Sequence, residues 1–176
     1  MTNGREALEE TGPLTPERYA EFIGQIEFRD IWLQGARLAN HHGPSAPERV
    51  AITVDSQASF DPLPAGFRVT HTYLLRAANK QTDLLEIDAT FALDFDSQAP
   101  MTGPIFELFS EINLPVNSWP YLREYVSTAV ARMGWLPVTL PAIKRGTRLP
   151  ATSNEPPKPA RKRRTRNRPN DTTVLE

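Results

Sequence analysis

SWPYLREYVSTAVARMGWLPVTLP, residues 118–141, is the stretch that decides the fold. It predicts one amphipathic helix followed by a short extended run. Ser118 is expected at the N-cap and Pro120 in the first turn, where a missing N–H does no harm. Gly134 predicts the C-terminal end of the helix. The apolar stripe of this helix recurs with helical spacing and consists of Trp119, Leu122, Val126, Ala129, Val130 and Met133.

Alternation of apolar and polar residues predicts four strands before this helix. They cover residues 26–35, 50–54, 67–75 and 85–95. The fourth is the clearest, because one of its faces is apolar and the other carries Glu and Asp. Such period-2 patterning with one polar face indicates an antiparallel sheet that is covered on one side.

Helices are predicted on either side of the strands. A short N-terminal helix is expected to start at Thr15-Pro16-Glu17 and to end near residue 23. After the strands, a short helix over 105–112 and a link over 113–117 lead to the long helix. Strands followed by helices predict an α+β fold: a four-stranded antiparallel sheet with one long and one short C-terminal helix packed on it, and a short N-terminal helix.

The chain has 176 residues, of which 39% are apolar, so it can form one modest core and not two. Residues 1–14 are expected to be a flexible N-terminus and residues 15–149 one domain. Residues 150–176 are expected to be a disordered basic tail, because they are rich in Pro, Lys and Arg and poor in apolar residues.

Composition also predicts the compartment. The chain has no cysteine, which excludes disulfides and thiolate metal sites. No apolar run approaches the ~20 residues that span a bilayer. Glu6, Glu9 and Glu10 stand where a secretory signal needs an apolar segment. We therefore expect a cytoplasmic protein.

The net charge of −1 conceals two oppositely charged parts. Residues 156–176 hold seven Lys or Arg and two acids, whereas residues 1–155 hold thirteen and nineteen. Either the tail binds nucleic acid, ribosomes or anionic lipid by counterion release, or it is a solubilising segment that folds back on the acidic body. Its cations are Lys158, Arg161, Lys162, Arg163, Arg164, Arg166 and Arg168.

The sequence carries no pattern typical of an enzyme. Gly-x-Ser-x-Gly, the P-loop and Gly-x-Gly-x-x-Gly are absent, so we expect no enzymatic activity, no catalytic residue and no cofactor. His41 and His42 lack a nearby carboxylate pair with ligand spacing, which favours a loop over a metal site. His71 is expected to be a hydrogen-bonded residue of the core or of an interface.

PYLREYV, a helix remainder and LPVTL resemble the C-terminal helix and following segment of the SecB family of export chaperones. Weaker similarities are Arg29-Asp30-Ile31 in the first strand and Leu84-Leu85-Glu86-Ile87 in the fourth. The resemblance covers about residues 23–140. It implies a homotetramer, built as a dimer of dimers, that binds unfolded polypeptides without ATP and passes them to the SecA motor. Apolar residues on both faces of the first strand also predict self-association.

Two departures from the family fit a divergent SecB-like branch. Gln34 replaces a Glu of the first strand, and residues 142–146 replace an aromatic and acidic segment. That branch includes chaperones of toxin–antitoxin pairs, whose client is an antitoxin. Exported precursors and an antitoxin therefore both stay open as clients. A nucleic-acid-associated adaptor that acts through the basic tail is the third hypothesis.

The resemblance implies a motor-binding surface at Asp30, Leu84 and Glu86. These carboxylates can act jointly only if the first and fourth strands bring them close together. Client binding needs an exposed apolar groove, to which free backbone edges can add hydrogen bonds. The aromatic candidates for this groove are Trp32, Phe106, Phe109, Trp119, Tyr121, Tyr125 and Trp135.

Overall fold

The computed structural model describes residues 14–44, 50–80, 82–136 and 138–143. Residues 1–13 and the whole basic tail, which were predicted to be flexible and disordered, lie outside these ranges. The elements follow in the order α1 (Pro16–Gly24), β1 (Ile26–Asn40), β2 (Ala51–Leu63), β3 (Gly66–Ala78), β4 (Asp83–Ser97) and α2 (Gly103–Arg132). The predicted α+β fold is confirmed.

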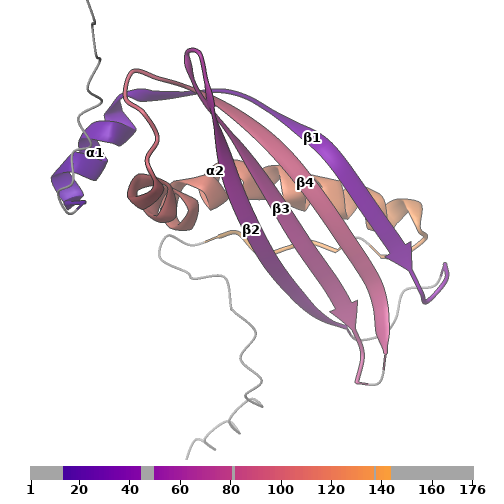
Figure 1. Ribbon diagram of the computed structural model, residues 1–176. Coiled ribbons are helices and arrows are strands. Elements are labelled where there is room, and N and C mark those ends of the chain that lie inside the picture. The colour runs from indigo at the N-terminus through magenta and orange to yellow at the C-terminus, as the bar shows by residue number, and fades with distance from the viewer. Residues whose placement is uncertain (1–13, 45–49, 81, 137, 144–176) are drawn as a thin grey trace, which may run out of the picture.

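The four strands form one antiparallel sheet in the order β1-β4-β3-β2, so β1 and β2 are its edges. Helix α2 lies against one face, which we call the core face, and α1 lies at one end of the sheet (Figure 1). The other face, called the open face, carries no described helix. Alternate residues of β3 and β4 are buried on the core face, from Phe67 to Ala77 and from Leu85 to Phe95.

Helix α1 forms as predicted. The Thr15 side chain accepts a hydrogen bond from the Arg18 N–H, and Pro16 occupies the first turn. Tyr19 and Phe22 are its buried residues. The Tyr19 hydroxyl donates a 2.7 Å hydrogen bond to Asn113 of α2, which ties α1 to α2.

Strand β1 does not keep the strict alternation predicted for it. Register shifts occur between Phe28 and Asp30 and between Leu33 and Gly35, so Arg29 and Gln34 are extra residues. Each bulge reverses the direction of the side chains that follow it. The two bulges together bring the apolar residues of β1 to the core face, opposite β4: Ile26, Phe28, Ile31, Leu33, Ala36 and Leu38.

Helix α2 corrects the predicted pair of C-terminal helices. It is continuous from Gly103 to Arg132, so the expected link over 113–117 is helical and Pro115 and Pro120 lie inside the helix. Ser118 is therefore not an N-cap. It is fully buried, and its hydroxyl donates to the Leu114 carbonyl at 2.8 Å. The two prolines remove backbone donors, and α2 changes direction along its length (Figure 1).

The end of α2 and its apolar stripe follow the prediction. Gly134 has a φ of +80°, the left-handed conformation that ends helices. The Trp119 indole donates to the Pro141 carbonyl at 2.7 Å, and Arg123 donates to the Leu140 carbonyl at 2.8 Å. These bonds fix the segment after α2 against the helix. No helix in the described ranges has both the length and the apolar character needed to cross a membrane.

Candidate functional site

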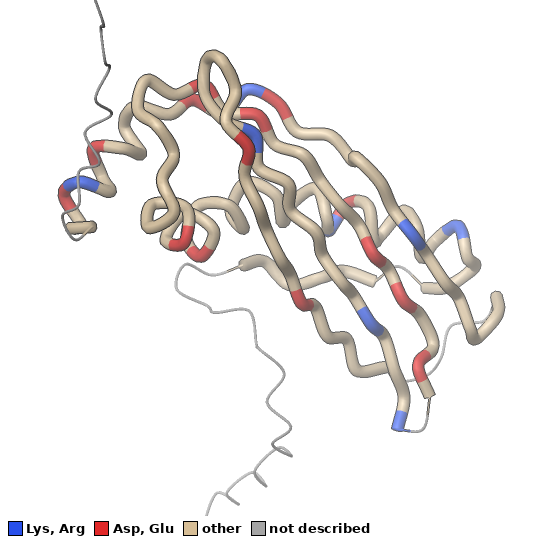
Figure 2. The backbone as a smooth tube through the Cα atoms, viewed as in Figure 1, with Lys and Arg blue, Asp and Glu red and all other residues tan. Residues whose placement is uncertain are grey.

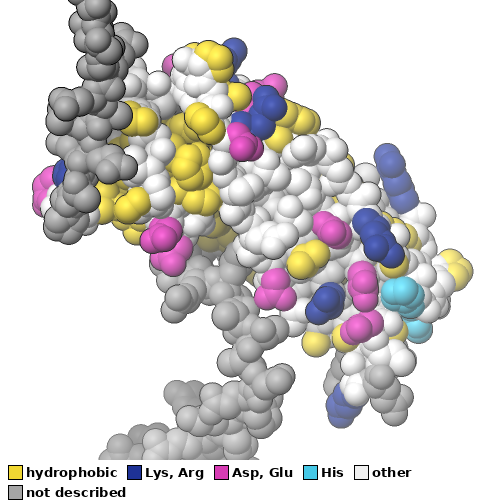
Figure 3. Space-filling model, viewed as in Figure 1, with side chains coloured by type: hydrophobic (Ala, Val, Ile, Leu, Met, Phe, Trp, Pro, Cys, Tyr) yellow, Lys and Arg dark blue, Asp and Glu magenta, His cyan; other side chains and the backbone are white. Residues whose placement is uncertain are grey.

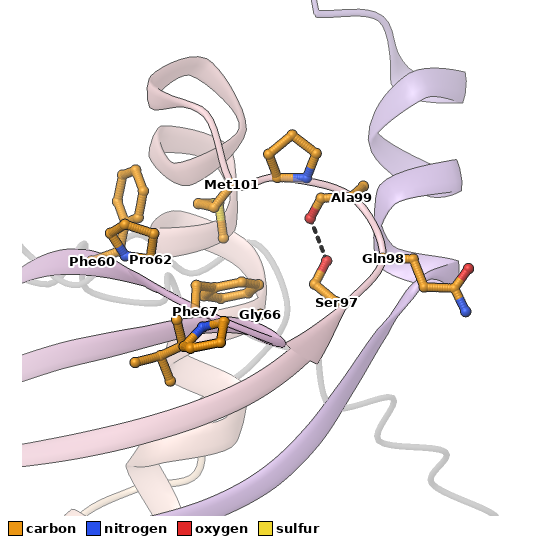
Figure 4. Close-up of a pocket in the computed structure, with 11 residues that line it drawn as sticks. Phe60, Pro62, Gly66, Phe67, Ser97, Gln98, Ala99 and Met101 are labelled. Atoms are coloured by element: carbon orange, nitrogen blue, oxygen red, sulfur yellow. Dashed lines mark hydrogen bonds between the residues drawn. The ribbon is translucent and has the colours of Figure 1, made fainter. Parts of the chain in front are cut away.

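A hollow of about 280 Å³ lies at the end of the sheet that carries α1. Three segments enclose it: the end of β2, the β2–β3 turn and the chain between β4 and α2 (Figure 4). We call it the end cavity. Its eleven lining residues include no charged side chain: Phe60, Pro62, Leu63, Pro64, Gly66, Phe67, Ser97, Gln98, Ala99, Pro100 and Met101.

The inner wall of the end cavity rests on an aromatic cluster. Phe67 is 1% exposed, and its ring stacks on Phe95 with 5.1 Å between centroids. Phe109 meets both rings edge-on, and Phe22 of α1 stacks on Phe67 at 6.2 Å. Closely packed aromatic rings give this wall a fixed shape.

Backbone contacts hold the outer walls of the end cavity. The Ser97 N–H donates to the Ala65 carbonyl at 3.0 Å, and the Ser97 hydroxyl donates to the Ala99 carbonyl at 2.5 Å. Gly66 lies so close to the Phe95 carbonyl that a Cβ atom there would overlap it. A side chain at position 66 would therefore push β3 away from β4 and open the wall.

The surface around this end of the molecule is apolar. Figure 3 shows hydrophobic side chains gathered over the end that carries α1, with charged side chains around them and at the opposite end of the sheet. The volume of the end cavity falls just below the ~300–1,000 Å³ typical of small-molecule pockets. It is therefore suited to one or two apolar side chains of a larger partner, and not to a hydrated or charged ligand.

The seven aromatic residues predicted for a client groove do not lie together in the structure. Phe109, Trp119 and Trp135 are buried, with exposed fractions of 0%, 6% and 5%, because they fill the core beside the sheet and α2. Tyr121 and Tyr125 lie on α2 outside the end cavity, the first exposed and the second partly buried. These five residues are therefore not brought together at one surface.

The remaining two aromatic candidates lie on different faces. Trp32 is on the open face, under the Arg68 guanidinium at 4.7 Å. Phe106 contacts Phe60 at 4.8 Å and so supports the end cavity from α2. The residues that line the cavity come largely from 62–67 and 97–101, which the sequence indicated only as turns because they are rich in Pro and Gly. The apolar residues inside those turns were the available signal.

The predicted motor-binding residues do not form one patch within a single chain. Asp30 pairs with Asp94, whereas Glu86 pairs with Ala39. Eight residues of β4 therefore separate Asp30 from Glu86, which corresponds to about 27 Å. Leu84 is 3% exposed and belongs to the core. Figure 2 shows charges of both signs in two groups along the strands, with an uncharged stretch between them.

Arg68 and Asp94 form a bidentate ion pair on the open face. Two guanidinium nitrogens donate to the two carboxylate oxygens at 2.7 and 2.8 Å. The hydrogen bonds from Arg68 lower the pKa of Asp94, and the same pairing raises the pKa of Arg68. Asp94 is therefore already paired and offers little free charge to a partner.

A polar cluster inside the core pairs a Ser with a His, an arrangement that resembles catalytic chemistry. His71 Nδ1 and the Tyr73 hydroxyl lie 2.9 and 2.8 Å from Ser118 Oγ. All three residues are buried, so Ser118 has no route to a substrate. His71 is confirmed as a hydrogen-bonded core residue. In the described ranges, no three His, Asp or Glu side chains gather as a metal site.

Comparisons with known proteins agree with this architecture. No protein-family model matches the sequence. No curated protein matches it either. Among solved structures, the chain is similar to the Mycobacterium tuberculosis SecB-like chaperone Rv1957 in complex with a ChAD peptide from the Rv1956 HigA1 antitoxin. The TM-score is 0.64 at 25% sequence identity, over 73% of this chain and 98% of that chain.

Two features define the fold class of this chain. One is an antiparallel sheet of order β1-β4-β3-β2, and the other is a long kinked helix on its core face. The similarity to this solved structure, in fold and over most of the sequence, supports a SecB-like fold for this chain.

Proposed function

We propose that this chain is an ATP-independent holdase chaperone that binds unfolded polypeptides. The observation that carries this proposal is the end cavity, an accessible apolar hollow with no charged lining, on the fold of a SecB-like chaperone. Unfolded chains present apolar side chains at irregular intervals, and an uncharged cavity takes them without reading a sequence. Phe60 and Met101 supply large apolar side chains to its lining (Figure 4).

We further propose that the client is an antitoxin and not an exported precursor. The similar solved structure is a complex with an antitoxin peptide, which supports this class of client. Delivery to the SecA motor would need Asp30 and Glu86 to act jointly, and the register of β1 and β4 separates them. A Debye length of about 8 Å at physiological salt is far shorter than that separation. Motor docking would therefore require residues of two chains.

Self-association is part of the proposal. Phe28, Leu33 and Leu38 of edge strand β1 point to the core face and are 40%, 41% and 39% exposed. Helix α2 lies under β4 and leaves this row uncovered. A row of apolar side chains along a sheet edge is typical of an interface between copies. A homotetramer formed as a dimer of dimers, which the family resemblance implies, would cover the row.

Suppression of client aggregation tests the proposed function. We expect the purified chain, without ATP, to keep a chemically denatured antitoxin in solution at equimolar ratio. A matched reaction uses a chain that ends at residue 149. If holding disappears with the basic tail, the end cavity is not the binding site. If only retention of RNA or DNA disappears, the tail acts separately and the adaptor hypothesis describes an accessory activity.

A further inference from the structure

Helix α1 lies beside the end cavity without forming one of its walls. Figures 1 and 4 show it next to the chain between β4 and α2, which closes one side of the cavity. Among the described residues, none of those that line the cavity belongs to α1. Phe22 of α1 is 3% exposed, and its ring stacks on Phe67, a lining residue, with 6.2 Å between centroids. The helix therefore covers part of the aromatic cluster that supports the cavity.

Phe67 belongs to a row of rings on the core face. Its ring stacks on Phe95 at 5.1 Å, and Phe95 meets Phe28 edge-on at 5.5 Å. Phe28 lies on the uncovered core face of β1 and is 40% exposed. The row therefore connects an exposed apolar side chain to the end cavity. A ring in the place of Phe22 would pack on the member of this row that also lines the cavity.

Helix α1 is short and depends on docking for its structure. It has nine residues, and isolated helices shorter than about 12–15 residues are marginal in water. Its buried side chains are Tyr19 and Phe22, and the Tyr19 hydroxyl donates to Asn113 at 2.7 Å. Gly24 and Gln25, which connect α1 to β1, are exposed. A small element of this kind opens at a lower free-energy cost than the whole fold. Its release would leave the sheet and α2 in place.

We propose that α1 is a displaceable cover over a second client subsite, which Phe22 occupies in the free chain. An aromatic side chain of an unfolded client takes the place of Phe22 on Phe67, and a neighbouring apolar side chain of the client enters the end cavity. This inference rests on the proposed holdase function and adds its regulation. Docked α1 and bound client exclude each other at this subsite.

Ring stacking favours aromatic side chains of the client over aliphatic ones. Aromatic pairs gain from stacked or edge-on geometry beyond the area that they bury. Phe67 already presents a face to Phe22, with 28° between the ring planes. Because α1 competes for this face, the apparent affinity for the client is reduced in proportion to the fraction of chains in which α1 is released. Between clients, the cover keeps this aromatic surface from contact with other chains.

Distances between spin labels test the inference on the full chain. The sequence has no cysteine, so Ala20→Cys on α1 and Glu111→Cys on α2 place labels at these two exposed positions alone. Adding a chemically denatured antitoxin should replace a narrow Ala20–Glu111 distance distribution by a broad one. The control pair, Glu111→Cys with Gln57→Cys on β2, should keep its distribution. Antitoxin that binds without changing the Ala20–Glu111 distances overturns the inference.

Loosening α1 gives a second readout. Tyr19→Phe removes the hydrogen bond to Asn113 and keeps the ring, so a larger fraction of chains has α1 released. It should therefore strengthen binding of the denatured antitoxin by at least about threefold. Glu21→Gln, at an exposed position of α1, is the matched control and should bind like the parent. If α1 is merely structural, Tyr19→Phe binds equally or more weakly, and that result overturns the inference.

The composition of the client tests the aromatic preference. An antitoxin in which Leu replaces every Phe, Tyr and Trp should leave the Ala20–Glu111 distribution narrow, because no ring takes the place of Phe22. Equal broadening by the two antitoxins overturns the aromatic subsite. If the parent chain keeps no denatured client in solution, the proposed function fails as well.

Discussion

His71 Nδ1 lies 2.9 Å from Ser118 Oγ, joining the middle of β3 to the middle of α2. The Ser118 hydroxyl has one proton, which it donates to the Leu114 carbonyl. It must therefore accept hydrogen bonds from both His71 and Tyr73. This arrangement assigns the proton of the neutral His71 ring to Nδ1 and makes Ser118 the acceptor for two buried donors.

Ser118→Ala should destabilise the fold by about 1–3 kcal/mol, because two buried donors lose their acceptor. Urea unfolding measures the loss. Tyr73→Phe in the Ser118→Ala background should recover part of it, since one of the orphaned donors is then removed. Equal stability of Ser118→Ala and the parent chain would show that the cluster does not join sheet and helix.

Stability should fall as the pH is lowered from neutral. Burial lowers the pKa of His71 to about 4, whereas the unfolded chain has a pKa near 6.5. Between these values the unfolded state binds more protons, so acid favours unfolding. The loss should reach about 2 kcal/mol between about pH 7 and pH 5, above the range in which carboxylates titrate. Urea unfolding at both pH values measures it, and His71→Gln should remove this dependence.

Gly66→Ala should destabilise the fold by at least about 1–3 kcal/mol and deform the end cavity. The added methyl group overlaps the Phe95 carbonyl, and neither backbone can yield without loss of the β3–β4 ladder. Thermal unfolding measures the change. Gly24→Ala is the matched control, because a Cβ atom there meets nothing within 4 Å. A Gly66→Ala chain as stable as this control would contradict the close packing.

Much of this fold could be predicted from periodicity, and the exceptions have physical causes. The core faces of β3 and β4 follow the alternation because both strands are central and covered by α2. In β1 the alternation fails, since bulges at Arg29 and Gln34 leave no mark in a period-2 pattern. Strand β2 continues to Leu63, well past the predicted end, because pairing with β3 maintains it where the sequence is half polar.

The candidate site was harder to predict than the fold. Trp119 and Trp135 were candidates for the client groove because they are aromatic. In the structure, each buries its ring and donates its indole N–H to a backbone carbonyl. Conversely, the walls of the end cavity come from short turns. Their apolar residues acquire a common surface only when the β2–β3 turn meets the chain after β4. Local sequence shows neither the burial of these indole rings nor the meeting of the two turns.

Leu33→Glu should shift the chain toward the monomer. Leu33 is 41% exposed on the uncovered core face of β1, and a carboxylate there would have to be desolvated in an interface. Sedimentation at micromolar concentration measures the change. Leu74→Lys is the matched control, because Leu74 is 37% exposed on the open face. Equal sedimentation of the parent and Leu33→Glu chains would place any interface elsewhere.

The central claim is that the end cavity holds the client, and Met101→Glu tests it most directly. A carboxylate in this uncharged cavity should weaken binding of a denatured antitoxin by at least about tenfold, because apolar contact is lost and a charge is desolvated. Leu136→Lys alters an apolar side chain that is 74% exposed outside the cavity and should bind like the parent. Affinity by fluorescence anisotropy, with unfolding midpoints to verify folding, decides the question. A folded Met101→Glu chain that binds the antitoxin as tightly as Leu136→Lys would contradict the account.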